Sequence, residues 1–248
     1  MADHTTYGLV CSELSEDLSK TNLGELKLDS FQDNSVQIKI KAASLNFPDL
    51  LMTQGKYQNR PNLPFALGME GAGIVEKVGS GVSSFKEGDE VMFGGWGHGA
   101  IAESIILPEG LVSLKPKSLN FSEAASFKTA YLTAYVGLIR RGELKQGETL
   151  LVHGASGGVG MAAVQVGKLY GAKVIASGTS DEKLKIVKTW GADEIINTGL
   201  EGSVSFREEV KELTDGKGAD VIYDPVGGDV FDESIPVSYT HLTLPTNH

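Results

Sequence analysis

One stretch decides the fold of this chain: Leu150-Leu151-Val152-His153-Gly154-Ala155-Ser156-Gly157-Gly158-Val159-Gly160. An apolar run ends in small residues, and apolar residues then recur at helical spacing as far as position 170. This order predicts a strand, a tight turn and a helix. Small residues let a pyrophosphate approach the backbone, where free N–H groups and the positive end of the helix dipole hold it. We therefore expect a dinucleotide to bind at Ala155, Ser156, Gly157, Gly158, Val159 and Gly160.

The motif reads Ala155-x-Gly157-x-x-Gly160, with alanine where the strict dinucleotide motif has its first glycine. The alternative is a glycine-rich turn that binds nothing. The predicted strand before the motif and the predicted helix after it are the context that the motif requires.

The next predicted strand indicates which dinucleotide binds. An NAD site usually has an acid about 20 residues after the glycines, where this chain has the uncharged Ser177. The hydroxyls and the lysine that follow suit a 2′-phosphate, whereas Asp181 and Glu182 fit the first turn of a helix, where the dipole favours acids. Lys183 could also be an ordinary solvated lysine. We expect NADPH rather than NADH, with a site that includes Ser177, Gly178, Thr179, Ser180 and Lys183.

Composition and charge exclude several classes of protein. The chain has 248 residues, 41% of them apolar and 22% charged, with a net charge of −10 and a single cysteine, Cys11. Such a chain is long enough for two globular domains and is unsuited to nucleic acid or anionic membranes. One cysteine excludes an internal disulfide and a multi-cysteine metal site. The N-terminus lacks the pattern of a secretory signal and no apolar run is as long as a membrane span, so we expect a cytoplasmic protein.

The pattern changes near residue 124. Residues 1–124 predict short strands punctuated by Gly, Pro and Asn, as in a small barrel. Ser122 is the predicted N-cap of a helix, and a longer helical stretch runs through Thr133 to Ile139. From residue 149 strands and helices alternate, which predicts an α/β domain with a parallel sheet, covering 125–236.

The end of the chain departs from this pattern. Residues 237–248 contain no Asp, Glu, Lys or Arg, and Val237 to Thr246 match the conceptual translation of a transposase-type sequencing adapter. We therefore expect 237–248 to be a non-native tail, which is excluded from fold reasoning. The chain as written should then expose an apolar sheet edge at the strand that ends in Tyr223, and should be poorly stable and poorly active.

The first half resembles a known family. Gly68-Met69-Glu70-Gly71-Ala72-Gly73-Ile74-Val75-Glu76-Lys77-Val78-Gly79-Ser80-Gly81-Val82 and Phe85-Lys86-Glu87-Gly88-Asp89-Glu90-Val91 resemble the signature of medium-chain dehydrogenases/reductases. The zinc branch of that family has His where this chain has Met69, and Cys where it has Asn46. Neither side chain offers the imidazole or thiolate that a zinc site prefers. The chain is thus similar to the zinc-free NADPH:quinone oxidoreductase branch, and no metal is expected.

The resemblance, which covers about residues 8–236, implies a GroES-like β-barrel domain followed by a Rossmann domain. It further implies that Asn46 and Asp49 lie near the nicotinamide end of the cofactor and that Thr133 contacts the cofactor. For Asn46 and Asp49 the alternative is turn chemistry before a helix. Val226 follows a predicted strand, at the edge where a Rossmann ligand should lie.

Tyr57 is a candidate proton donor. The segment from Asn46 to Tyr57 is similar to one in mitochondrial-type 2-enoyl thioester reductases that ends in a proton-donating tyrosine, and a phenol can protonate an enolate carbon within reach. A tyrosine that only packs on the substrate cleft is the alternative. For His98 and His153 we favour structural, hydrogen-bonded roles.

These observations predict NADPH-dependent, metal-independent reduction of quinones or α,β-unsaturated carbonyls, which accept hydride at carbon because their oxygen takes up the charge. Asn46 and Tyr57 are the candidate catalytic residues. One alternative is a 2-enoyl thioester reductase, and another is a non-catalytic NADPH-binding structural protein. The expected partner is a small-molecule quinone or enone, and by resemblance the full-length form would be a homodimer.

Overall fold

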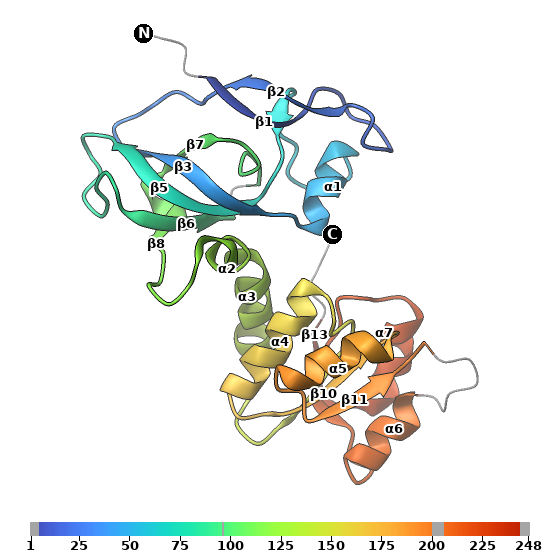
Figure 1. Ribbon diagram of the computed structural model, residues 1–248. Helices are drawn as coiled ribbons and strands as arrows, with labels where there is room; N and C mark the ends of the chain where they lie inside the picture. The colour runs from blue at the N-terminus through green and yellow to red at the C-terminus, as the bar shows by residue number, and fades with distance from the viewer. Residues whose placement is uncertain (1–4, 96, 200–205, 244–248) are drawn as a thin grey trace. The chain divides into compact units, whose positions relative to one another are not determined.

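The computed structural model describes residues 5–95, 97–199 and 206–243 and divides into two compact units (Figure 1). The division falls between Thr129 and Ala130, close to the boundary predicted after residue 124. Within the described residues no helix combines the length and the apolar character needed to cross a membrane. Each unit is described by itself.

The N-terminal unit consists of two antiparallel sheets and short helices. One sheet has the order β2-β1-β4 and the other the order β7-β3-β5-β6-β8. The elements are β1 (Thr5–Cys11), β2 (Thr21–Lys27), β3 (Ser35–Ser44), α1 (Phe47–Thr53), β4 (Phe65–Ala66), β5 (Glu70–Val78), β6 (Glu90–Gly94), β7 (Ser104–Pro108), η1 (Glu109–Leu111), β8 (Val112–Leu114) and α2 (Phe121–Ala125); α3 (Lys128–Tyr135) begins at its end.

Apolar and polar residues alternate along the start of β3, and the apolar ones form part of the core of this unit. Val36 and Ile38 are buried and pack with Val75, Val91 and Phe93 from the neighbouring strands. The period of two places one face of each strand on this core. The strand-rich character predicted for residues 1–124 is therefore confirmed, although β1, β2 and β4 were not predicted.

The predicted start of α2 is wrong by two residues. Asn120, rather than Ser122, is the N-cap: its side-chain oxygen accepts from the Glu123 N–H at 2.9 Å. The Glu123 carboxylate accepts in return from the Asn120 N–H at 2.8 Å. This reciprocal pair satisfies two N–H groups at the start of the helix, which a cap at Ser122 would not do.

The C-terminal unit is a five-stranded parallel sheet with helices on both faces. Its strand order is β11-β10-β9-β12-β13. The elements after α3 are η2 (Val136–Arg141), β9 (Thr149–Val152), α4 (Gly158–Leu169), β10 (Lys173–Gly178), α5 (Asp181–Thr189), β11 (Glu194–Asn197), α6 (Phe206–Leu213), β12 (Ala219–Tyr223), α7 (Asp229–Ser234), η3 (Ile235–Val237) and β13 (Ser238–Thr243).

Both faces of the central strands are buried. Leu150 and Val152 pack in a cluster with α3, α4 and α5, whereas Leu151 packs in a second cluster with α6 and Val237. In Figure 1 the helices α4 and α5 lie across one face of β10 and β11. Burial on both faces explains why β9 reads as a continuous apolar run rather than an alternating one. The predicted doubly wound α/β domain is confirmed.

The edge of β12 differs from the expectation. Ser238–Thr243 forms β13, which pairs in parallel with β12, so the apolar edge that we expected to be bare is covered. Val237, the first residue of the predicted tail, is buried in the cluster of Leu151. The strand was not predicted because residues 237–248 were excluded from fold reasoning as a non-native tail. That 237–248 is non-native stays a prediction, and its residues 244–248 lie outside the described part of the chain.

His153, directly after β9, is a buried polar residue in this unit. Nδ1 lies 2.6 Å from the Ser177 hydroxyl and Nε2 lies 2.9 Å from the Ser234 hydroxyl, while the ring packs edge-on against Phe206. This is the hydrogen-bonded structural role that the sequence favours for His153. Burial lowers the pKa of the imidazole to about 4, although Asp224 nearby opposes the shift.

We predict that His153 makes the C-terminal unit acid-sensitive. Because the imidazole has a pKa of about 4 when folded and about 6.5 when unfolded, the unfolded chain binds more protons between these values. The free energy of unfolding should therefore fall by roughly 3 kcal/mol from pH 6.5 to pH 4. Urea unfolding at several pH values measures it. His153→Gln should remove this part of the loss; an equal loss in the variant would refute the assignment.

Candidate active site

The strand order of the C-terminal unit shows where a ligand of such a sheet is expected to bind. After β9 the chain adds β10 and β11 on one side of β9, and then returns to add β12 and β13 on its other side. Ligands of such sheets bind at this switch point between β9 and β12, outside the carboxyl ends of the strands. The turns after the two strands lie side by side: the His153 N–H donates to the Tyr223 carbonyl at 2.9 Å. A Cβ on Gly154 would lie 3.0 Å from Val226 Cγ2. The structure thus brings the glycine motif and Val226 to one edge.

The glycines of the motif do different work. A Cβ on Gly160 would lie 2.4 Å from the Gly154 carbonyl oxygen, so only glycine allows α4 to start this close to the turn. A Cβ on Gly157 would meet only that oxygen, at 3.4 Å, and one on Gly158 would meet nothing within 4 Å. Gly157 is the N-cap of α4 and offers no side chain to the first N–H groups of the helix. The first N–H groups of α4 therefore have no side-chain cap, and the space beside Gly158 is open. Both features suit the binding of a pyrophosphate.

Ser177 lies in β10 at this same edge, but its side chain is used inside the fold. The residue is 2% exposed, and its hydroxyl is within hydrogen-bond distance of His153. Its carbonyl accepts from the Ala155 N–H at 3.0 Å, which ties the glycine turn to β10. The hydroxyl of Ser177 thus pairs with His153 while its backbone borders the glycine turn, and its place in the cofactor site stays a prediction.

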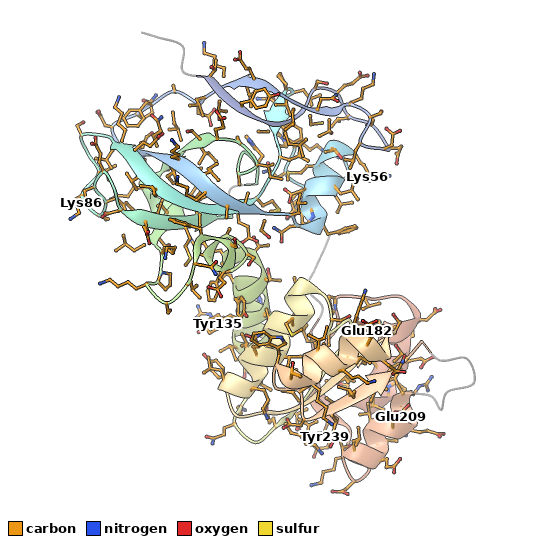
Figure 2. All side chains as sticks on the ribbon, viewed as in Figure 1. Lys56, Lys86, Tyr135, Glu182, Glu209 and Tyr239 are labelled. Atoms are coloured by element: carbon orange, nitrogen blue, oxygen red, sulfur yellow. The ribbon has the colours of Figure 1, made fainter. Side chains whose placement is uncertain are left out.

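The segment after β10 carries the residues predicted for the 2′-phosphate. Thr179 and Lys183 are exposed, whereas the Ser180 hydroxyl accepts from the Lys183 N–H at 3.5 Å as the N-cap of α5. Asp181 accepts from the Asn197 side chain at 2.7 Å, and Glu182 is exposed at the start of α5 (Figure 2). Both acids lie in the first helical turn, as predicted, where they complement the helix dipole.

Asp224 organises the turn that carries Val226. One carboxylate oxygen accepts from the Val226 N–H at 2.9 Å and from the Gly227 N–H at 3.0 Å. Val226 itself is 56% exposed. The sequence did not single out Asp224; the signal was an aspartate directly before Pro-Val-Gly at the end of a buried strand. Thr133 lies half-buried in α3 of the same unit.

The residues of the N-terminal unit form a separate buried network. The Asn46 side-chain amide donates to Glu70 Oε1 at 3.0 Å, and the Thr129 N–H donates to Glu70 Oε2 at 2.7 Å. Glu70 is 1% exposed, so both of its oxygens are committed to these partners. A glutamate inside the small-residue strand Glu70–Val78 was the sequence signal for this network, which we had quoted only as part of the family resemblance.

Asp49 performs the turn chemistry that the sequence left as an alternative. It is buried in α1, and its carboxylate accepts from the Asn46 N–H at 2.7 Å and from the Gly68 N–H at 3.1 Å. Burial raises the pKa of this carboxyl, against the lowering effect of the two N–H donors. Asp49 thereby holds Asn46 and the Gly68 turn together at the start of α1.

Tyr57 borders a cavity of about 610 Å³ that is also lined by Gln58, Met69, Gly95, Gly97 and His98, which we term the Tyr57 cavity. Tyr57 is partly buried and packs against the apolar cluster of Cys11, Met52, Phe65 and Leu67. Its hydroxyl makes no hydrogen bond within the described residues, so it is available to a ligand. His98 differs from the expectation, because its ring packs on Phe65 but has no hydrogen-bond partner in the described part of the chain.

Met69 stands in the wall of this cavity, and Asn46 is bonded to Glu70. The side chains at both positions where the zinc branch has its ligands are therefore a thioether and an amide, which are poor zinc ligands. Among the residues that the structure describes, no group of three or more His, Cys, Asp or Glu side chains is placed to hold a metal ion.

Comparison with known proteins agrees with this architecture. Residues 32–117 match the alcohol dehydrogenase GroES-like domain, and residues 158–241 match the zinc-binding dehydrogenase family. A quinone oxidoreductase-like protein 2 homolog from Nematostella vectensis is 38% identical over 228 residues, which cover 92% of this chain and 61% of that protein. The chain thus spans about six tenths of the length of such curated relatives.

Two solved structures are similar over nearly the whole chain. Escherichia coli quinone oxidoreductase complexed with NADPH has a TM-score of 0.83 and 33% identity, covering 95% of this chain and 70% of that one. The CurK enoyl reductase has a TM-score of 0.84 and 30% identity, covering 94% and 71%. By both of its domains and by these relatives, the chain belongs to the medium-chain dehydrogenase/reductase superfamily, in its quinone oxidoreductase-like branch.

Proposed function

We propose that this chain is the catalytic part of an NADPH-dependent reductase of quinones or α,β-unsaturated carbonyls that uses no metal. The observation that carries the proposal is the open space before the first N–H groups of α4, at the sheet edge shared by β9, β10 and β12. The similarity to the E. coli quinone oxidoreductase complexed with NADPH supports the cofactor.

The pyrophosphate would lie against the backbone of Ala155 to Gly160, and Val226 would border the nicotinamide half. Thr179, Ser180 and Lys183 would hold the 2′-phosphate, since no carboxylate stands at the end of β10 and Asp181 is already bonded to Asn197. When bound, the cofactor supplies a hydride from nicotinamide C4. The preference for NADPH over NADH rests on these residues.

The substrate would occupy the Tyr57 cavity, and the family resemblance assigns cofactor contacts to Asn46 and Thr133. A quinone or enone needs no Lewis acid, because its own oxygen accepts the charge when hydride reaches carbon. This suits a wall that contains Met69 in place of a zinc ligand. The protein would exclude water, orient the double bond and donate a hydrogen bond or proton, for which the Tyr57 hydroxyl has no competing partner among the described residues.

A second candidate is reduction of 2-enoyl thioesters. The similarity to the CurK enoyl reductase and the placement of Tyr57 in the wall of the cavity favour it. The two candidates are separated by measuring NADPH oxidation by absorbance, in parallel assays with 1,4-quinones, enals and crotonyl thioesters. Turnover of thioesters alone would select the second candidate, and binding of NADPH without turnover would select the structural role.

We predict that Gly157→Ala weakens NADPH binding by about tenfold or more without destabilising the fold. The new methyl group has room in the protein but would stand where the pyrophosphate approaches. Fluorescence titration and thermal unfolding measure the two effects. Gly160→Ala is the contrasting variant, which should lose stability because of the clash with the Gly154 carbonyl. Gly110→Ala, where a Cβ would meet nothing within 4 Å and which lies in the other unit, is the neutral control. Unchanged NADPH affinity in Gly157→Ala would contradict the placement of the pyrophosphate.

Lys183→Ala should lower the affinity for NADPH by about three- to tenfold and leave that for NADH unchanged, because only NADPH carries the 2′-phosphate. Titration of both dinucleotides measures the ratio. Lys185→Ala, an exposed lysine on the same helix, is the matched control. If both variants lower NADPH affinity equally, the effect is general charge and Lys183 has no specific role.

Tyr57→Phe tests the proton donor. If the hydroxyl protonates the enolate, kcat for an enone should fall by about a hundredfold while NADPH affinity stays the same. Stopped-flow measurement of NADPH oxidation, with thermal unfolding as a check on folding, gives both quantities. An undiminished kcat in the folded variant would leave Tyr57 as a packing residue only.

A further inference from the structure

A second cavity also has His98 in its lining. This barrel-side cavity, of about 470 Å³, has an apolar floor that includes Phe65, Ala66, Ile105 and Leu107. Glu25 and Asp29, both exposed, stand among the residues at its rim. Nothing in the proposed reaction uses this space. His98 is the feature that connects it to the reaction, because this residue lines both the barrel-side cavity and the Tyr57 cavity.

The backbone around His98 is built to place a side chain at this position. Gly95, Gly97 and Gly99 all have positive φ, at 89°, 112° and 103°, in the region that favours glycine. A Cβ on Gly97 would lie 2.1 Å from Asn59 Nδ2. Directly after His98 the Gly99 N–H donates to the Ala66 carbonyl at 2.8 Å, which fixes the segment to β4. The segment is thus tightly constrained, while the histidine carries the one full side chain between two glycines.

The imidazole itself is held by packing alone. Its ring lies edge-on to the buried ring of Phe65, with 5.9 Å between the ring centroids. It has no hydrogen bond within the described part of the chain. Burial lowers the pKa of His98, so the ring is neutral near pH 7. An apolar group can therefore pack against it without desolvating a charge. The half-buried imidazole of His98 has no polar partner in the described residues and lines both the Tyr57 cavity and the barrel-side cavity.

We propose that His98 limits the length of the substrate: its ring separates the Tyr57 cavity from the barrel-side cavity, so that an alkyl substituent on the reacting ring or enone is stopped there. This inference rests on the proposed function, which places the substrate in the Tyr57 cavity. Removing the imidazole would join the two spaces and open the apolar floor at Phe65 and Ile105 to such a substituent. Burial of a few methylene groups on that floor is worth about tenfold or more in selectivity.

The test compares methyl-1,4-benzoquinone with hexyl-1,4-benzoquinone. For the wild-type chain kcat/KM should gain nothing from the longer substituent. In His98→Ala the hexyl-to-methyl ratio of kcat/KM should rise about tenfold, and in His98→Val by less. His98→Phe keeps a ring in the wall and should leave the ratio as in the wild type. Glu25→Ala alters only the rim of the barrel-side cavity and should also leave it unchanged.

Binding of the unreactive pair 4-methylphenol and 4-hexylphenol, measured by calorimetric titration, repeats the comparison without turnover. If the wild-type chain oxidises no NADPH with any quinone or enone, the proposed function fails, and this binding ratio still decides the role of His98. A wild-type chain that already favours the hexyl compounds would overturn the proposal. So would a folded His98→Ala with an unchanged ratio, or a gain in His98→Phe equal to that in His98→Ala. Should His98→Ala not fold, His98→Val and the wild-type ratio decide.

Discussion

The close approach of Gly160 to the Gly154 carbonyl is the constraint on which the rest of the structure depends. With 2.4 Å between that oxygen and the place of a Cβ, no other residue lets α4 begin within a few residues of β9. The consequence is a helix whose first N–H groups face open space at the switch point of the sheet. The hydrogen bond from the Ala155 N–H to the Ser177 carbonyl then fixes this turn to β10.

A buried polar cluster lies next to the turn that carries the glycine motif. His153 lies between the Ser177 and Ser234 hydroxyls, and Asp224 shapes the neighbouring turn through two backbone N–H groups. Buried polar groups of this kind are costly unless they are hydrogen-bonded, and here they fix the carboxyl ends of three strands. In the N-terminal unit Glu70 has the same role, since it holds both Asn46 and the start of α3. In each unit, then, buried hydrogen bonds fix the backbone around the candidate site residues.

The sequence predicted what depends on spacing. The strand, turn and helix around the glycine motif, the alternation of strands and helices, and the placement of Asp181 and Glu182 all follow from local pattern, and the structure confirms them. It did not predict what depends on where a side chain points. Ser177 was included in the predicted cofactor site, and the structure shows its hydroxyl paired with a histidine 24 residues earlier in the chain. Asn120 and Ser122 are both good N-caps by type, and only the pairing with Glu123 chooses between them.

Long-range partners explain the remaining differences. Glu70 and Asn46, which are hydrogen-bonded, are 24 residues apart in the sequence. One carboxylate oxygen of Asp49 accepts from the Asn46 N–H and the other from the distant Gly68 N–H. β13, which pairs with β12, was not predicted because residues 237–248 were excluded from fold reasoning as a non-native tail. The family resemblance indicated Asn46, Asp49 and Tyr57 as site residues. Only the folded structure shows that Asn46 belongs to a hydrogen-bond network, Asp49 to a turn and Tyr57 to a cavity wall.

The most direct test of this account is a titration of the purified chain with NADPH, followed by the change in nicotinamide fluorescence. We predict saturable binding with one site per chain, weaker binding of NADH, and release of NADPH by excess 2′,5′-ADP. Absence of any saturable signal with either dinucleotide, from a chain whose circular dichroism shows a folded α/β protein, would contradict the central claim that the turn from Gly154 to Gly160 holds a pyrophosphate.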